Sequence, residues 1–162
     1  MDKDFIGIRF EFSHEYMNHL GRLFNELSVE NYTWYSSQSE NYIADRSGVQ
    51  LFLPDGVYDG VEFKNLIQNA EYYIHLLCLY GVPKEKPFDP DNIRDYDDYV
   101  CSNAEIALFS ADSIVDLYAK DSKNLDTIAM LCREHKKRGG IDADRPIKFL
   151  TRQNDERTGF YI

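Results

Sequence analysis

The residues best suited to binding chemistry lie in one short acidic stretch of the chain. Aspartates and tyrosines are interleaved there: Asp89, Asp91, Asp95, Tyr96, Asp97, Asp98 and Tyr99. Carboxylates attract cationic groups, and tyrosine offers a large contact area at low entropic cost, so the stretch predicts a docking surface for a basic protein. A solvated loop and helix start, where the helix dipole favours acidic residues, is the alternative. A calcium loop is excluded, because its sixth position must be glycine and here holds Arg94 or Tyr96.

The histidines and cysteines form no catalytic or metal-binding pattern. His14 and His19 resemble the metal pair of a zinc-protease helix, but that pair lies four residues apart and these lie five apart. His75 and Cys78, three apart on an expected strand, should point to opposite faces. The three cysteines lack a CxxC pair and are expected as small buried apolar side chains. No phosphate-binding or nucleophile-elbow motif occurs either, so we predict no catalytic residue, no metal and no cofactor, and an enzyme is not favoured.

A second hypothesis places a small-molecule pocket, or an enzyme of unknown reaction, beside an aromatic hairpin. Trp34 and Tyr35 belong to a cluster of aromatic side chains, and Asp155 and Arg157 lie in a polar turn near the end of the chain. Together these four would combine apolar walls with a few polar groups, as ligand pockets do. Cross-strand packing within the hairpin is the alternative for the aromatic residues.

The charge of the chain points to a basic protein as partner. The formal net charge is −10, of which residues 1–83 carry −7, residues 84–126 carry −6 and residues 127–162 carry +3. This field repels a phosphate backbone, so direct nucleic-acid binding is not expected. An inhibitor or immunity-type protein is the leading hypothesis. A third hypothesis is that carboxylates on one face mimic the phosphates of nucleic acid and occupy a DNA-binding protein.

The start of the chain carries no recognisable targeting signal. Residues 5–12 include Arg9 and Glu11, which interrupt the apolar run that a signal peptide needs. No stretch of about 20 apolar residues occurs anywhere. The expected location is therefore the cytoplasm, without membrane contact.

Apolar periodicity predicts the order of helices and strands. A spacing of two marks strands, and a spacing of three to four marks helices. The predicted strands cover residues 6–12, 32–35, 41–44, 49–53, 72–80, 105–109, 114–120, 147–151 and 159–162. The predicted helices cover residues 13–28, 59–70, 93–101 and 125–138. Residues 36–40 are expected as a hairpin turn, and the Asp59 side chain as a helix cap.

These elements predict an α+β fold: one mixed, mainly antiparallel sheet with three to four helices packed on it. The expected order is roughly βαββ(β)αβ followed by αββαββ. We expect a single domain over residues 1–162. Two small split-βαβ lobes, residues 1–80 and 93–162, are the alternative.

Several segments resemble a known family when they are taken in order. They are Asn31-Tyr32-Thr33-Trp34-Tyr35, Leu51-Phe52-Leu53-Pro54, Glu71-Tyr72-Tyr73-Ile74 and Asn154-Asp155-Glu156-Arg157-Thr158. The chain resembles an uncharacterised family of small Gram-positive bacterial proteins, a domain of unknown function. The resemblance implies a bacterial cytoplasmic setting and assigns no catalytic role.

Overall fold

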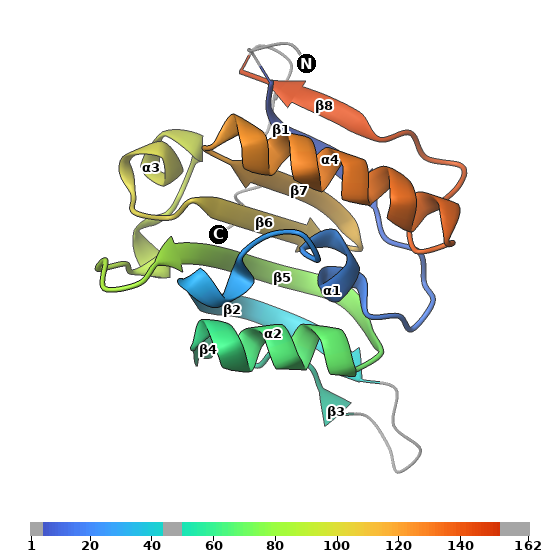
Figure 1. The fold of residues 1–162 in the computed structure, drawn as a ribbon, viewed down its shortest axis with the longest axis horizontal. Coiled ribbons are helices and arrows are strands. Elements are labelled where there is room, and N and C mark those ends of the chain that lie inside the picture. Colours follow the sequence, from blue (N-terminus) through green and yellow to red (C-terminus); the bar gives the residue numbers. More distant parts are fainter. Residues whose placement is uncertain (1–4, 44–49, 153–162) are drawn as a thin grey trace.

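The computed structural model describes residues 5–43 and 50–152. These residues contain eight strands and four α-helices (Figure 1). The strands are β1 (Phe5–Glu11), β2 (Tyr32–Ile43), β3 (Gln50–Leu51), β4 (Gly56–Tyr58), β5 (Tyr72–Pro83), β6 (Ile106–Ala111), β7 (Ile114–Ala119) and β8 (Lys148–Thr151). The helices are α1 (His19–Leu23), α2 (Gly60–Asn69), α3 (Tyr96–Cys101) and α4 (Ser122–Lys137), with two 3₁₀ turns, η1 (Val29–Asn31) and η2 (Pro90–Asn92).

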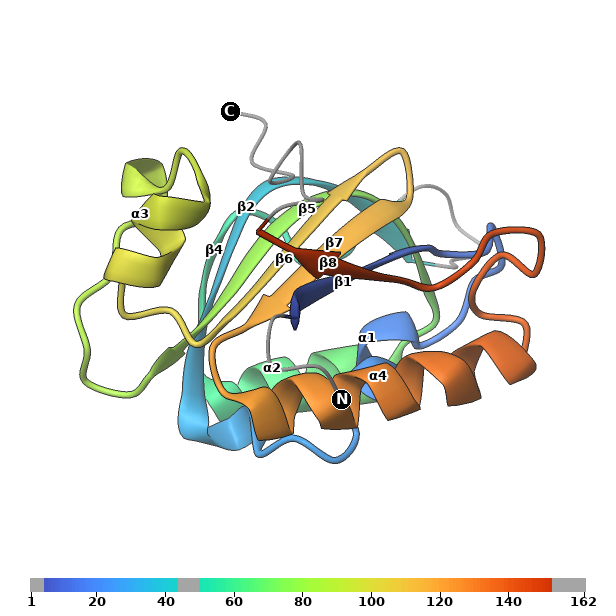
Figure 2. The same cartoon turned by 90° about the horizontal axis from the view of Figure 1, so that it is seen from above.

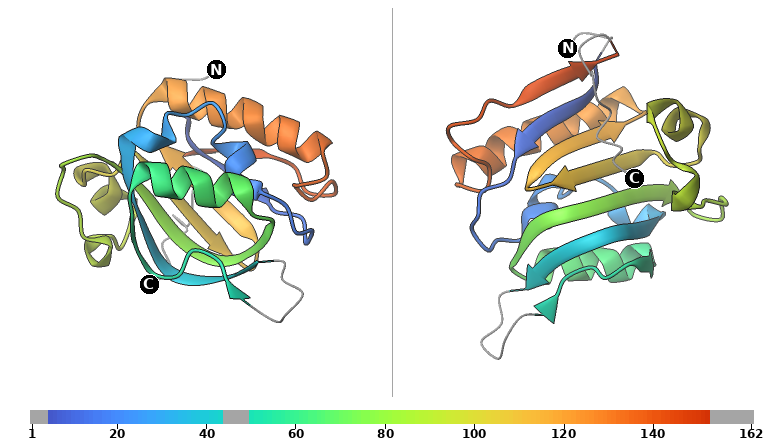
Figure 3. Two further views of the ribbon diagram at one scale, coloured as in Figure 1. Left: turned by 60° about the horizontal axis from the view of Figure 1, so that its bottom comes forward. Right: turned by 180° about the vertical axis from the view of Figure 1, so that it is seen from behind.

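The strands form one sheet in the order β3-β2-β5-β6-β7-β1-β8, and β4 adds to the edge of β2. Each strand pair within the described residues is antiparallel. The strand β1 lies between β7 and β8, so the two ends of the described chain meet in neighbouring strands (Figure 3). The predicted α+β class with a mainly antiparallel sheet is confirmed.

Side-chain alternation gives this sheet two different faces. On one face, residues such as Ile8, Leu79 and Leu117 pack beneath α1, α2 and α4 and form the main core (Figure 2). The opposite face, here called the open face, carries Tyr80 and Tyr118 in a second and smaller apolar cluster. The segment that contains η2 and α3 covers part of this open face.

Residues 32–43 form one long strand, so the predicted hairpin is wrong. The polar run 36–40 stays within β2 and pairs with β5, with one extra residue in β2 between Ser37 and Glu40. Gln38 has a φ of 51°, and the buried Ser36 hydroxyl donates to the Leu53 carbonyl (3.0 Å). The polar side chains therefore mark a bulge, which has the same composition as a turn.

The helix predicted over residues 13–28 shortens to α1, because part of that stretch pairs with β5. Met17 and Tyr72 exchange backbone hydrogen bonds, with N···O distances of 3.2 and 3.0 Å. The Tyr72 hydroxyl accepts from the N–H of Leu20 (2.9 Å) and donates to the Ile67 carbonyl (2.8 Å). A buried tyrosine therefore satisfies a backbone N–H at the start of α1 and ties this helix to α2.

The other helices and the second hairpin agree with the pattern. The Asp59 side chain accepts from a backbone N–H in the first turn of α2, as predicted. The last long helix is α4, and its cap is Asp121. The turn between β6 and β7 consists of Asp112 and Ser113, both with positive φ (52° and 69°), as a two-residue antiparallel hairpin requires. The strand predicted over 159–162 lies outside the described residues.

The central strand β5 contains an extra residue, and this changes which side chains share a face. Leu76 pairs with Glu40 and Ile74 with Asn41, so the extra residue opposite β2 is His75. Because of this bulge, His75 and Cys78 both point to the open face. The prediction that they lie on opposite faces is therefore wrong.

Candidate functional site

The acidic segment, residues 89–99, lies at one end of the open face (Figure 2). Asp89 caps η2 by accepting from the Asp91 N–H (2.9 Å), and Asp95 caps α3 by accepting from the Asp98 N–H (2.8 Å). Asp89, Asp91 and Asp95 are all exposed. The segment thus presents carboxylates to solvent on a backbone that the same side chains help to order.

The two tyrosines of this segment face inward rather than outward. Tyr99 is 1% exposed, and its hydroxyl donates to the Glu105 carbonyl (2.6 Å). Burial raises the pKa of Tyr99 well above its ordinary value. Tyr96 is half-buried and packs against Tyr118 of β7, with 5.4 Å between ring centroids. The tyrosines therefore anchor the segment, and the exposed surface belongs mainly to the aspartates.

Besides the caps made by Asp89 and Asp95, two further aspartates have partners within the chain. Asp97 forms an ion pair with Arg152 (2.8 Å), whose guanidinium also lies over the Tyr96 ring. Asp98 accepts from the backbone N–H of Arg94 (3.0 Å). The remaining three, Asp89, Asp91 and Asp95, form the part of the segment best placed to meet a partner's cations.

The residues of the predicted pocket are not brought together by the described part of the fold. Trp34 is fully buried in the main core, where its ring stacks on Phe63. Tyr35, its neighbour on β2, points to the open face and packs against Phe88. Asp155 and Arg157 lie outside the described residues. Trp34 and Tyr35 therefore do not line one pocket together.

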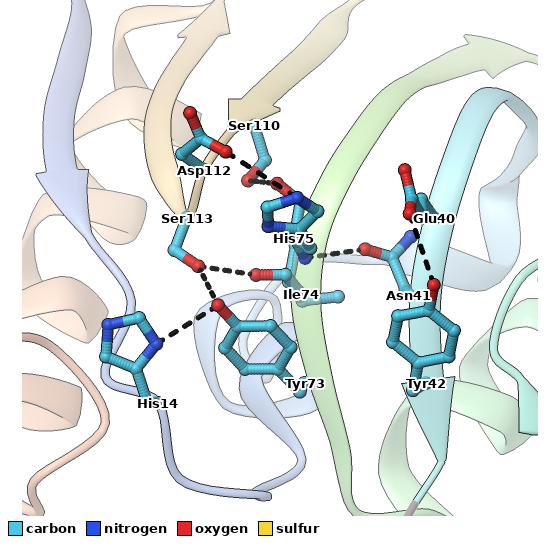
Figure 4. Close-up of polar contacts among 10 residues, drawn as sticks. All are labelled: His14, Glu40, Asn41, Tyr42, Tyr73, Ile74, His75, Ser110, Asp112 and Ser113. Carbon is cyan, nitrogen blue, oxygen red and sulfur yellow. Dashed lines mark hydrogen bonds and ion pairs between the residues drawn. The ribbon is translucent and has the colours of Figure 1, made fainter. Parts of the chain in front are cut away.

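A polar network that sequence reasoning missed joins β5 to the β6–β7 turn (Figure 4). The buried Ser113 hydroxyl lies 2.9 Å from both the Ile74 carbonyl and the Tyr73 hydroxyl. A carbonyl can only accept, so Ser113 donates to Ile74 and accepts from Tyr73. Tyr73 in turn accepts from His14 Nδ1 (3.0 Å), which assigns the proton to that ring nitrogen.

The same network places two histidines beside one tyrosine. The Tyr73 ring stacks between His14 and His75, at centroid distances of 5.6 and 6.3 Å. His75 Nε2 lies 3.5 Å from a carboxylate oxygen of the exposed Asp112. Only the bulge in β5 and the loop after β1 bring these residues together, and neither was visible in the sequence pattern. These contacts hold the β6–β7 turn against β5, which is a structural role.

Replacing Ser113 by alanine should lower the free energy of unfolding by about 1–2 kcal/mol, because the change leaves the buried Ile74 carbonyl without this donor. Asp112→Asn is the matched control. It alters the neighbouring turn residue, which is exposed and at which asparagine tolerates a positive φ, so the loss should stay below about 0.5 kcal/mol. Urea denaturation measures both. Equal losses in the two variants would contradict the role assigned to Ser113.

A pair of buried histidines connects α1 to α4 on the other side of the sheet. His19 and His135 are 0% and 1% exposed, and His19 Nδ1 lies 2.8 Å from His135 Nε2. His19 Nε2 donates to the Glu15 carbonyl (2.9 Å), so His19 Nδ1 must accept from His135 Nε2–H. His135 Nδ1 is then an acceptor, and within the described residues it has no hydrogen-bond partner.

Burial keeps both rings neutral. It lowers the pKa of His19 to about 4, against a smaller rise from the bond to the Glu15 carbonyl. It lowers the pKa of His135 to about 3, and His19, Arg22 and Arg138 add to the effect. The pair is therefore a neutral hydrogen-bonded contact at neutral pH.

A groove of about 590 Å³ lies over this pair, between α1, α2 and α4. Its lining combines two arginines, two glutamates and three amides with smaller contributions from apolar residues: Asn18, Gly21, Arg22, Asn25, Glu26, Gln68, Met130, Leu131, Glu134, His135 and Arg138. His135 and Arg138 lie at the end of α4, where cations offset the negative end of the helix dipole. Their contact with α1 appears only in the tertiary structure.

Within the described residues, metal-ligating side chains do not cluster, and two of the three cysteines are held as protonated thiols. No group of three or more histidine, cysteine, aspartate or glutamate side chains within them is arranged to hold a metal ion. Burial raises the pKa of Cys78 to about 11 and that of Cys132 to about 12, so both stay protonated thiols. Cys101 is exposed, against the expectation that all three cysteines are buried. None of the helices in the described part of the chain is long and apolar enough to cross a membrane.

Comparison with known proteins identifies relatives of the whole chain. A family model described as a protein of unknown function (DUF2691) matches residues 5–161. The uncharacterized protein YncE of Bacillus subtilis (strain 168) is 24% identical over 159 residues, which cover 96% of this chain and 98% of that protein. No solved structure matches. The expected resemblance to an uncharacterised Gram-positive family is confirmed.

Proposed function

The chain belongs to the DUF2691 family of proteins of unknown function, and we propose that it is a non-enzymatic protein-binding protein of the inhibitor or immunity type. The acidic segment would dock onto a basic protein partner. The observation that carries the proposal is that exposed carboxylates stand on a backbone anchored by buried tyrosines.

Pre-organisation supports this proposal. A partner that binds a flexible acidic loop must first order it, and that cost reduces affinity. Here the Tyr99 hydroxyl bond, the Tyr96 packing on β7 and the two aspartate caps already hold the segment in place. The partner's cations would meet carboxylates whose positions are set before binding.

Electrostatics supports it as well. Residues 89–99 carry five aspartates and one arginine, a formal net charge of −4, within a chain of net charge −10. Fields of one sign steer an oppositely charged partner and raise the association rate, and the effect falls as salt screens it. The DNA-mimic hypothesis shares this electrostatic basis and differs only in requiring a DNA-binding partner.

The proposal is tested with the triple variant Asp89→Asn, Asp91→Asn and Asp95→Asn. Asparagine is as good an N-cap as aspartate, so the substitutions remove three charges while retaining the caps of η2 and α3. Immobilised protein is used to capture partners from a lysate of the native host at about 50 mM and about 500 mM salt. These concentrations lie below and above about 0.1 M, at which exposed charges are screened over about 10 Å. We expect at least one basic protein to bind at low salt and to be lost in the triple variant.

The matched control carries Glu62→Gln, Glu71→Gln and Asp126→Asn, which remove the same charge from exposed positions elsewhere. It should retain the captured protein. A partner that both variants retain, or that both lose, would show that the acidic segment is not the docking surface. Capture of no protein at low salt would overturn the binding proposal itself.

A further inference from the structure

The groove between α1, α2 and α4 has the size and the chemistry of a small-molecule site. Its volume of about 590 Å³ falls within the range of about 300–1,000 Å³ typical of ligand pockets. Its lining residues belong mostly to α1, α2 and α4, which lie on one side of the sheet, whereas the acidic segment covers part of the open face (Figure 2). A ligand of this groove would therefore not contact the acidic segment.

The walls of the groove are held rigidly. A side chain at Gly21 would approach the Ile67 carbonyl to 2.6 Å, so α1 sits directly against the end of α2. The His19–His135 contact fixes α1 to α4 on the other side. Rigid walls favour a ligand of defined shape, because little is lost in ordering them.

The charges of the groove are balanced. Arg22 and Arg138 contribute two guanidiniums, Glu26 and Glu134 contribute two carboxylates, and the buried histidines are neutral. The Arg22 Nε donates to Asn18 (2.8 Å), which orients its guanidinium before any ligand arrives. In a chain of net charge −10, this is a local site where an anionic group can be bound.

His135 forms part of the lining but is only 1% exposed, and the edge of its ring lies against Gly140. The polar groups that the groove offers to a ligand are therefore its guanidiniums, carboxylates and amides.

We propose that this groove binds a small zwitterion of the free amino acid class. The ligand carboxylate would lie at Arg22 and Arg138, and its ammonium group at the carboxylates of Glu26 and Glu134. A purely anionic ligand meets repulsion from the two glutamates, and a purely cationic one meets repulsion from the two arginines. A zwitterion avoids both.

The test is an NMR titration of the ¹⁵N-labelled full chain with each of the twenty common amino acids, with succinate as an anion and putrescine as a cation. We expect at least one amino acid to give saturable shifts at the amides of Gly21, Leu131 and His135, with a Kd of about 1 mM or tighter. Arg22→Gln and Arg138→Gln should each weaken that Kd by about tenfold or more, as expected for a charge-assisted contact. Lys137→Gln, which removes a cation of α4 outside the groove, should leave the Kd unchanged.

Two results would overturn the proposal. One is the absence of saturable shifts at these amides with any amino acid at about 10 mM, which is about ten times the weakest Kd expected. The other is binding of succinate or putrescine as tightly as any amino acid. The thermal midpoint of each variant is measured first, and where Arg22→Gln proves unfolded, Arg138→Gln alone decides, since its exposed side chain lies at the end of α4.

Discussion

Replacing Trp34 by alanine is expected to lower the free energy of unfolding by about 3–5 kcal/mol, the usual range for truncating a large buried aromatic side chain. The ring is 0% exposed and stacks on Phe63 and Phe24, at centroid distances of 4.4 and 5.5 Å. Its Nε1 donates to the Val29 carbonyl (2.9 Å). The variant thus loses two stacked aromatic contacts and one buried hydrogen bond. Urea denaturation followed by circular dichroism measures the loss, because Trp34 is the only tryptophan of the chain.

Tyr35→Ala is the matched control for this prediction. Its side chain is half-buried on the open face and packs against Phe88 of the segment that leads to η2. We expect less than half of the Trp34→Ala loss, together with faster amide exchange in residues 84–95. A small loss for Trp34→Ala, below about 1 kcal/mol, would instead indicate that Trp34 lines an adaptable pocket, as the sequence hypothesis proposed.

Acidification should unfold this protein through the buried histidine pair. The folded-state pKa values, about 4 for His19 and about 3 for His135, lie below the value of 6.5 that both have when exposed. Between pH 6.5 and these lower folded-state values, the unfolded chain therefore binds more protons than the folded chain, and the free energy of unfolding decreases as the pH falls. The stabilisation is complete above about pH 6.5 and decreases from there through pH 4. For His19 alone, the pKa difference between 6.5 and about 4 corresponds to a contribution of about 3 kcal/mol to the free energy of unfolding, at about 1.4 kcal/mol per pKa unit.

The pH dependence is measured as urea midpoints between pH 7 and pH 4.5, and His135→Gln is the decisive variant. A glutamine amide reaches about as far as Nε2, so it can still donate to His19 while removing one of the two titrating rings. We expect the number of protons taken up on unfolding at about pH 5.5 to fall by about one. His14→Gln, which removes an exposed histidine outside the pair, is measured alongside as the control variant. Identical slopes for wild type and His135→Gln would contradict the buried neutral pair.

The candidate sites differ in how far the sequence could predict them. The acidic segment was visible because its residues are neighbours in the chain, and the helix dipole already favoured acidic residues at a helix start there; that Asp89 and Asp95 are the caps came from the structure. The direction of Tyr96 and Tyr99 was not visible, because it depends on Tyr118, a residue of a strand that follows in the chain. The groove and the His19–His135 contact join residues 116 positions apart, and no local pattern reports such a contact.

The amino-acid sequence alone determined the α+β class, most strand positions, the Asp59 cap of α2, the β6–β7 hairpin and the family. Each of these depends on periodicity, on a side chain beside its own backbone, or on short motifs, all of which are local. The tertiary structure alone decided that residues 32–43 run as one strand and that α1 begins at the Tyr72 hydroxyl. In these places, pairing with β5 outweighed local propensity, because a central strand satisfies more backbone hydrogen bonds than a local turn or cap can.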